Sequence, residues 1–132
     1  MKPLLTICLT AAAAAALSAC AADQSAEAAP PTGRSCFRPG DVDNWRTADE
    51  KSATFMVSRK ETWRAGLVGF CSDLNYSEHI SLQPRGASSW ICTGDDARLI
   101  IPSRTGGGGF CDAVEFKKLT PAEVAAAKAD KR

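Results

Sequence analysis

The sequence predicts a mainly β fold: a small antiparallel sheet or partly closed barrel, with a short C-terminal helix and two disulfides. Short runs in which apolar and polar residues alternate fill the middle of the chain and are separated by turn residues. The same part of the chain holds an even number of cysteines. Strong helix formers dominate only near the C-terminus, where the alternation stops.

Two alternating runs in the middle of the chain, residues 53–58 and 61–67, predict a β-hairpin. In each run apolar side chains recur at every second position, and the polar segment between the runs is short enough for a turn. The side chains expected to face the core are Phe55, Val57, Trp63, Ala65 and Leu67.

Shorter apolar segments predict the remaining strands, at residues 79–83, 89–92, 96–101 and 113–119. The alternation within these segments predicts which side chains share the core face. The expected sets are Ile80 with Leu82, Ala97 with Leu99 and Ile101, and Val114 with Phe116.

The end of the chain predicts a helix over residues 122–131. Thr120-Pro121-Ala122-Glu123 matches a capping box with proline at the first helical position, and strong helix formers follow it. Val124 is the only large apolar residue of this segment. We therefore expect the helix to lie at the domain surface, with little to pack against.

Residues 1–19 have the layout of a signal peptide. Lys2 gives a positive start, and the apolar run that follows is about 14 residues long, short of the roughly 20 needed to span a membrane. The run ends in Leu17-Ser18-Ala19-Cys20, which matches a bacterial lipobox, so Cys20 is the expected lipidation site. The alternative is an ordinary small-x-small cleavage site at Ala19-Cys20-Ala21, which would release a soluble periplasmic protein.

Residues 20–34 predict a flexible tether between the lipidated cysteine and the domain. They contain no large apolar side chain, so they cannot bury enough surface to offset the entropy lost on ordering. The single domain is then expected at residues 35–132, ending in the short helix. Ala21, rather than Asp, follows Cys20, and the resemblance to bacterial lipoproteins then implies the outer membrane, with the domain in the periplasm.

The charge balance gives no indication of a nucleic-acid partner. The chain has 16 basic and 15 acidic residues, and Lys2 is the only charged residue of the leader, so the remainder is neutral. No polybasic stretch occurs. The partners expected from the sequence are the membrane, through the lipid anchor, and an envelope protein or other envelope component.

The four cysteines beyond Cys20 predict two disulfides, because exported small domains are commonly cross-linked in this way. No two of them have the close spacing of a zinc site, so neither a metal nor any other cofactor is expected. Three pairings are possible, and the sequence alone does not choose between them. We favour Cys71–Cys111, which links a strand end to the last strand, with Cys36–Cys92, which ties the entry segment to the middle of the sheet.

No group of residues in the sequence predicts catalysis. His79 is the only histidine and has no evident partner for a triad or a metal site. Asp95-Asp96 follows a glycine and is typical of a turn, and Asp41-Val42-Asp43-Asn44 lacks the later residues of a calcium loop. The glycines Gly106–Gly109 predict a flexible turn, since no phosphate-loop lysine follows them.

Three tryptophans are the most promising candidates for binding. Trp63 alternates in phase with the predicted core and is expected to be buried. Trp45 and Trp90 lie beside turn-rich segments and are expected to reach the surface, where they could bind a partner. Core packing is the alternative for all three.

Five sequence elements occur in a fixed order along the domain. They are Cys36-Phe37-Arg38-Pro39-Gly40-Asp41-Val42-Asp43-Asn44-Trp45-Arg46, Trp63, Cys71-Ser72-Asp73-Leu74, Ile91-Cys92-Thr93-Gly94-Asp95-Asp96 and Cys111. With these elements the chain resembles a family of short Gram-negative envelope proteins of unknown function. The resemblance implies a small exported domain with paired cysteines, and it transfers no catalytic residue.

Together these patterns predict a non-enzymatic lipoprotein that acts as a binding module at the cell envelope. A purely structural envelope protein is the first alternative. A small hydrolase-type enzyme is the second, and it would need a cleft lined by carboxylates with shifted pKa values.

Overall fold

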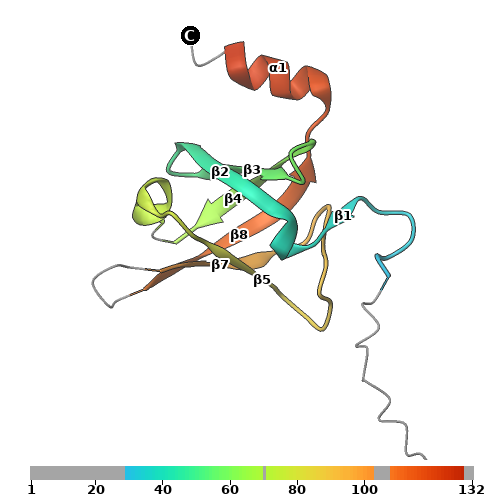
Figure 1. Ribbon diagram of the computed structural model, residues 1–132, viewed down its shortest axis with the longest axis horizontal. Helices are drawn as coiled ribbons and strands as arrows, with labels where there is room; N and C mark the ends of the chain where they lie inside the picture. Colours follow the sequence, from blue (N-terminus) through green and yellow to red (C-terminus); the bar gives the residue numbers. More distant parts are fainter. Residues whose placement is uncertain (1–28, 70, 103–107, 130–132) are drawn as a thin grey trace, which may run out of the picture.

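The computed structural model describes residues 29–69, 71–102 and 108–129 of the 132-residue chain. A six-stranded antiparallel sheet in the order β2-β3-β4-β8-β7-β5 curls into a half-barrel (Figure 1). Its strands are β2 (Val42–Asp49), β3 (Ser52–Val57), β4 (Glu61–Val68), β5 (Ser81–Pro84), β7 (Ala97–Ile101) and β8 (Gly109–Lys118). The predicted mainly β fold is confirmed.

Short elements complete the domain. A two-stranded sheet pairs β1 (Cys36–Phe37) with β6 (Ile91–Cys92). Two 3₁₀-helical turns, η1 (Pro39–Asp41) and η2 (Ser72–Tyr76), and one helix, α1 (Pro121–Ala129), connect to or extend from the strands.

The predicted hairpin is present as β3 and β4, joined by a tight turn at Ser58 and Arg59. Both residues have left-handed backbones, with φ of 49° and 57°, as hairpin turns that match the strand twist require, and the Lys60 N–H closes the turn on the Val57 carbonyl at 3.1 Å. The backbone N–H of Ser58 donates to the carbonyl of Asp41 at 2.8 Å, and that of Arg59 donates to Asp43 Oδ2 at 2.7 Å. These two bonds hold a turn that has neither the glycine nor the asparagine such turns usually contain.

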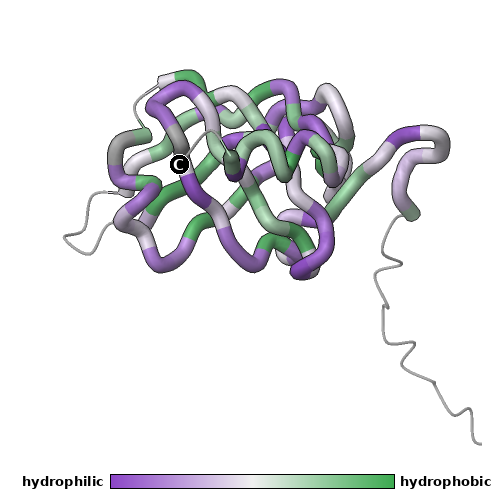
Figure 2. Tube along the Cα trace, turned by 90° about the horizontal axis from the view of Figure 1, so that it is seen from above, coloured by the Kyte–Doolittle hydropathy of each residue, from purple (hydrophilic) through white to green (hydrophobic). Residues whose placement is uncertain are grey.

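The core fills the inside of the curled sheet. Hydrophobic and hydrophilic residues alternate along the strands (Figure 2), so that each strand turns one apolar side inward. Phe37 joins Trp63 and Phe116 at ring-centroid distances of 4.8 and 5.6 Å, and Phe55 contacts Phe116 at 5.5 Å. Trp63 is fully buried, which confirms its predicted place.

The last strand differs from its prediction. We expected Val114 and Phe116 on the same face, but Phe116 is fully buried while Val114 lies half-exposed on the other face. A β-bulge at Glu115, where φ is 53°, adds one residue to β8 opposite Ala65. The extra residue reverses the alternation, so Ala113 rather than Val114 shares the core with Phe116.

The two outer strands of the sheet have their edges protected. On β2, which the sequence analysis missed, the N–H groups of Trp45 and Thr47 donate to the amide oxygens of Asn44 and Asn75. On β5, Pro84 has no backbone N–H to offer another strand. Neither edge therefore presents a free row of donors.

The C-terminal helix begins with the predicted capping box. The Thr120 N–H donates to Glu123 Oε2 at 2.8 Å, and the Glu123 N–H donates to Thr120 Oγ1 at 3.3 Å. No residue of α1 is buried, and the helix stands away from the sheet (Figure 1), as expected from its composition.

Both disulfides have the favoured pairing. Cys36–Cys92 joins directly opposed residues of β1 and β6, and Cys71–Cys111 ties the start of η2 to β8. Cys92 and Cys111 belong to the buried core, so each cross-link anchors a peripheral segment to the interior.

The N-terminal predictions concern residues that are largely outside the described part of the chain. The signal peptide and Cys20 lie there, as does the first part of the tether. Arg34, at the end of the tether, contacts the domain: its guanidinium donates to Asp95 Oδ1 at 2.6 Å and to the Thr93 carbonyl. Within the described ranges, no helix has the length and apolar character needed to cross a membrane.

Candidate functional site

Trp45, a predicted binding residue, is half-buried on β2 and has a structural role. Its indole Nε1–H donates to the carbonyl of Leu74 at 3.0 Å, and its ring packs against the edge of the core. Leu74 is itself fully buried. Trp45 therefore holds η2 against the sheet, and only part of its surface is left for a partner.

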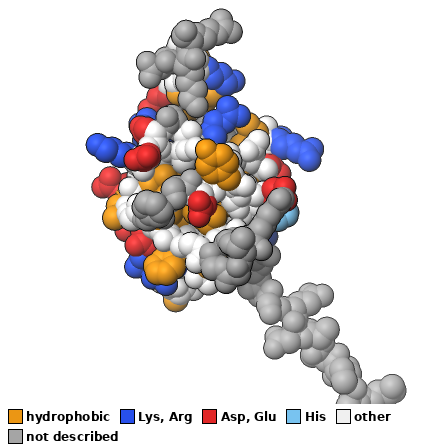
Figure 3. All heavy atoms as spheres, turned by 90° about the vertical axis from the view of Figure 1, so that its left-hand side faces the viewer, with side chains coloured by type: hydrophobic (Ala, Val, Ile, Leu, Met, Phe, Trp, Pro, Cys, Tyr) orange, Lys and Arg blue, Asp and Glu red, His pale blue; other side chains and the backbone are white. Residues whose placement is uncertain are grey.

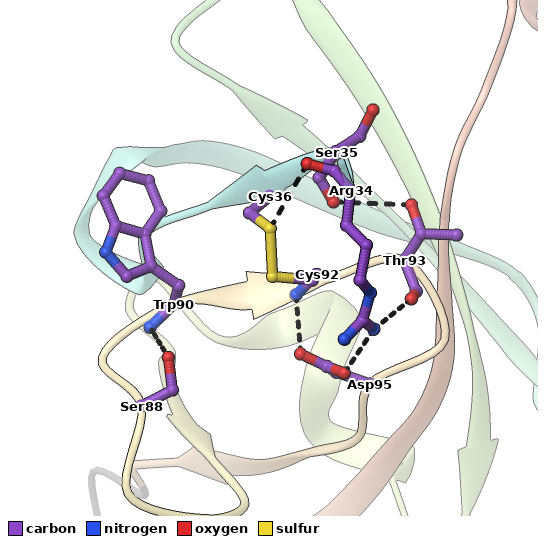
Figure 4. Close-up of a disulfide and its surroundings, with 8 residues drawn as sticks. All are labelled: Arg34, Ser35, Cys36, Ser88, Trp90, Cys92, Thr93 and Asp95. Carbon is purple, nitrogen blue, oxygen red and sulfur yellow. Dashed lines mark hydrogen bonds and ion pairs between the residues drawn. A yellow bond between two sulfur atoms is a disulfide. The ribbon is translucent and has the colours of Figure 1, made fainter. Parts of the chain in front are cut away.

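Trp90, the second predicted binding residue, lies just before β6. Figure 4 shows its indole pointing away from the Cys36–Cys92 disulfide, while its backbone N–H donates to Ser88 Oγ at 3.1 Å. The guanidinium of Arg38 lies 5.6 Å from the ring centroid, a cation–π arrangement. Trp45 and Trp90 are thus anchored by different elements, and their role in binding stays a prediction.

The aspartates that the sequence places close together accept hydrogen bonds from backbone N–H groups. Asp95 Oδ2 accepts the Cys92 N–H at 2.9 Å, Asp96 Oδ1 accepts the Glu115 N–H at 2.9 Å, and Asp43 caps the hairpin turn. His79 is exposed and lies just ahead of β5. Among the described residues, no three His, Cys, Asp or Glu side chains are grouped to hold a metal ion.

Exposed apolar side chains do not form one patch on the face shown in Figure 3. Hydrophobic groups are scattered there among charged ones. The large hydrophobic residues with high exposure in the described ranges are Met56, Val68, Tyr76 and Phe110. Phe110 is partly covered by Arg98, whose guanidinium lies 5.1 Å from the ring centroid.

An open cleft of about 350 Å³ lies on the outer face of the sheet, where the β2–β3 turn approaches β4 and β8. Ala65 and Gly66 of β4 are among the residues that line it. Charged and polar side chains make up the rest: Asp49, Lys51, Ser52, Arg64, Glu115 and Lys117. This concentration of side chains able to bind a polar ligand makes the cleft the candidate site.

A hydrogen-bonded group fixes one side of the cleft. The hydroxyl of Ser52, only 8% exposed, donates to Asp49 Oδ1 at 2.9 Å and accepts from Arg64 Nη2 at 3.1 Å. The hydrogen bond from Ser52 lowers the pKa of Asp49 below its usual value, with bonds from the Lys51 and Ser52 backbone and the charge of Arg64 adding to it. Asp49 is therefore ionised at neutral pH. The Ser52 hydroxyl, which Asp49 binds, in turn holds the guanidinium of Arg64.

Three basic side chains and one threonine form a row across the outer face. The strand register places Arg46 opposite Thr54, Thr54 opposite Arg64, and Arg64 opposite Lys117, on four adjacent strands. Directly opposed residues have Cβ atoms about 5 Å apart, and like charges at that distance destabilise a sheet. Arg64 and Lys117 therefore repel each other at this position. The repulsion is offset in part, because Lys117 forms an ion pair with Glu123 at 2.5 Å and the charge of Arg64 acts on Asp49.

The β-bulge borders the same cleft. A non-glycine residue in the left-handed region, such as Glu115, costs roughly 1–2 kcal/mol and persists where its surroundings hold it. Here Asp96 binds the Glu115 N–H, and the carbonyl of Asp95 accepts the Phe116 N–H at 3.1 Å. The bulge places the Glu115 carboxylate at the cleft, and this carboxylate has no ion-pair or hydrogen-bond partner among the described residues.

Sequence reasoning missed this site because its members come together only through strand register. Asp49, Ser52, Arg64, Glu115 and Lys117 lie in separate segments, and each alone is typical of a solvated strand position or turn. A signal was present in Asp49-Glu50-Lys51-Ser52, a polar turn next to an alternating strand. This turn indicates a hairpin, but it does not indicate which other strands pair with that hairpin.

The half-barrel, its two disulfides and the polar cleft define a small cross-linked β domain. The chain belongs to a family of unknown function (DUF6491), whose model matches residues 3–132. The predicted resemblance to a family of unknown function is thereby confirmed. No curated protein and no solved structure matches the chain.

Proposed function

We propose that this protein is an exported lipoprotein and that its domain is a non-enzymatic binding module at the cell envelope. The observation that carries the export is that Cys36, Cys71, Cys92 and Cys111 form two disulfides. Disulfides persist in oxidising compartments such as the periplasm and are rare in reducing ones. The signal-peptide layout ahead of them supports the same location.

The lipid anchor would be attached to Cys20. The lipobox-like segment ends an apolar run, and the next residues form a polar tether that leads to Arg34. The absence of Asp after Cys20 supports the outer membrane, with the domain on its periplasmic side. A tether of this length, at about 3.3–3.6 Å per residue, lets the domain move tens of ångströms from the bilayer surface.

The chemistry of the cleft supports binding rather than catalysis. The buried hydroxyl of Ser52 donates to the ionised Asp49 and accepts from the guanidinium of Arg64, and no imidazole of the described residues binds it. His79 is exposed on another segment. Fixed donors and acceptors around an open space suit recognition of a charged ligand. A purely structural envelope protein is the alternative, and it requires that the cleft bind nothing.

Replacing Cys20 by serine tests the anchor. The Cys20→Ser protein should move from the membrane fraction to the soluble periplasm, because the thiol that accepts the lipid is gone. Cys8→Ser is the matched control, since Cys8 lies in the leader that is expected to be removed, and it should leave fractionation unchanged. If Cys20→Ser remains in the membrane fraction, the lipoprotein proposal is wrong.

A further inference from the structure

The outer-face cleft brings two cations onto directly opposed positions. Arg64 and Lys117 face each other on β4 and β8, a placement that opposes folding, although Lys117 forms an ion pair with Glu123 at 2.5 Å and Arg64 binds Ser52 at 3.1 Å. In proteins, a local arrangement that opposes folding is commonly retained for function. An anionic group placed between the two cations would contact the remaining donors of Arg64 and would share Lys117 with Glu123.

Arg64 is prepared for such a contact. Its guanidinium is a rigid fork with five N–H donors, and only Nη2 is engaged within the described chain, by Ser52. Because Ser52 is buried and bound to Asp49, it holds the guanidinium at the cleft wall. The remaining donors are left for a ligand, and little ordering entropy is lost when they bind one.

The cleft also holds unused charge of the opposite sign. The carboxylate of Glu115 has no partner within the described ranges, and a strained bulge presents it to the cleft. Asp49, by contrast, already accepts from the Ser52 hydroxyl and from the Lys51 backbone. A simple anion would therefore be repelled by Glu115, whereas a ligand that carries both signs would satisfy both sides.

We propose that this cleft binds a small zwitterionic phosphate ester, with the phosphate between Arg64 and Lys117 and the ligand's ammonium group on Glu115. A phosphate fits two opposed cations better than a carboxylate because it carries up to two negative charges and three acceptor oxygens. The inference deepens the binding role proposed above and rests on it, but it does not depend on the lipid anchor.

Titration of the Cys20→Ser chain with O-phosphoethanolamine tests the proposal directly. The backbone amide signals of Ser52, Arg64 and Glu115 should shift together in NMR spectra. Inorganic phosphate and ethanolamine, each of which supplies one half of the ligand, should each bind about tenfold more weakly, as expected for the loss of one charge-assisted contact. β-Alanine, a zwitterion with a carboxylate in place of the phosphate, should also bind about tenfold more weakly.

Three variants assign the two contacts. Arg64→Gln should weaken O-phosphoethanolamine binding by about tenfold or more. Glu115→Gln should abolish the preference for O-phosphoethanolamine over inorganic phosphate, because the carboxylate that binds the ammonium is gone. Arg98→Gln is the matched control: Arg98 is an exposed arginine of the same sheet, on β7, that lies against Phe110, and this change should leave binding unaltered.

Vesicles distinguish a free phosphate monoester from a lipid headgroup, in which the phosphate is a diester with one negative charge and the ammonium group is retained. Co-sedimentation of the Cys20→Ser chain with phosphatidylethanolamine vesicles, but not with phosphatidylcholine vesicles, would identify a lipid headgroup. Binding of O-phosphoethanolamine without vesicle binding would identify a soluble ester. Both outcomes support the proposal, and neither involves the anchor at Cys20.

The proposal is overturned if O-phosphoethanolamine causes no shift of the cleft signals. It is equally overturned if inorganic phosphate or β-alanine binds as tightly, or if Arg64→Gln binds like the unmodified cleft. Thermal unfolding of each variant establishes that it is folded. If Arg64→Gln is unstable, Arg64→Lys replaces it, because this change keeps the charge and loses the fork.

Discussion

The inner and outer faces of the central strands β3, β4 and β8 carry side chains of different kinds. On the inner face, Phe55, Trp63 and Phe116 are completely buried and contribute to stability by removing apolar surface from water. On the outer face of the same strands, Arg64 and Lys117 repel each other beside an open cleft. The comparison shows that the inner face stabilises the fold by apolar burial, whereas the outer face combines an unfavourable pair of cations with polar contacts such as the Lys117–Glu123 ion pair.

The largest effect is expected from truncating the inner face. Trp63→Ala should lower the free energy of unfolding by about 3–5 kcal/mol, because it removes a fully buried indole and leaves a cavity. Urea denaturation of the purified protein measures the change. A loss below about 1 kcal/mol would show that the inner face does not dominate stability.

Loss of the Cys71–Cys111 cross-link should come next. In the chain-entropy model, a disulfide that closes a loop of this size, with a sequence separation of 40, contributes about 3–4 kcal/mol. The double variant Cys71→Ala, Cys111→Ala should lose about that much in the same denaturation experiment. Intact mass should first show both disulfides in the unmodified protein; four freely alkylated thiols would contradict the structure.

The bulge at Glu115 is tested by comparing the losses of unfolding free energy in two alanine variants of β8. Val114→Ala should cost less than about 1.5 kcal/mol, because Val114 is only half-buried on the outer face, while Phe116→Ala should cost about 3–5 kcal/mol. Without the bulge both residues would share the core, so comparable losses for the two variants would show that the alternation is not reversed.

The smallest effect concerns the outer face and pH. The ion pair with Lys117, together with the Thr120 hydrogen bonds, lowers the pKa of Glu123 from 4.5 to about 2. Because the folded pKa is the lower one, its stabilising contribution is complete above pH 4.5 and is lost as the pH falls toward 2. NMR titration should follow this at the amides of α1, and Lys117→Gln should raise the pKa of Glu123.

The sequence predicted the inner face well and the outer face poorly. Alternation with period two identifies which side chains point inward in 53–58 and 61–67 without knowledge of their neighbours. It fails at Glu115, because a bulge changes the count by one residue and leaves no local mark in the sequence. It also missed β2, whose polar composition suits an edge strand and resembles a loop.

The candidate site could not be predicted for a related reason. The row of Arg46, Thr54, Arg64 and Lys117 exists only through the pairing of four strands. Strand pairing depends on contacts between distant segments, and single-strand patterns do not contain it. The disulfides could be predicted from the sequence because four cysteines allow only three pairings.

The side-chain amides that bind the edge of β2 and the proline on β5 have a consequence for domains held at high density. Unprotected strand edges join into extended intermolecular sheets when molecules are held close together. Asn44 and Asn75 occupy the outward donors of one edge, and Pro84 removes a donor from the other. Copies of this domain confined to a surface at high density should therefore diffuse past one another as separate particles, without polymerising.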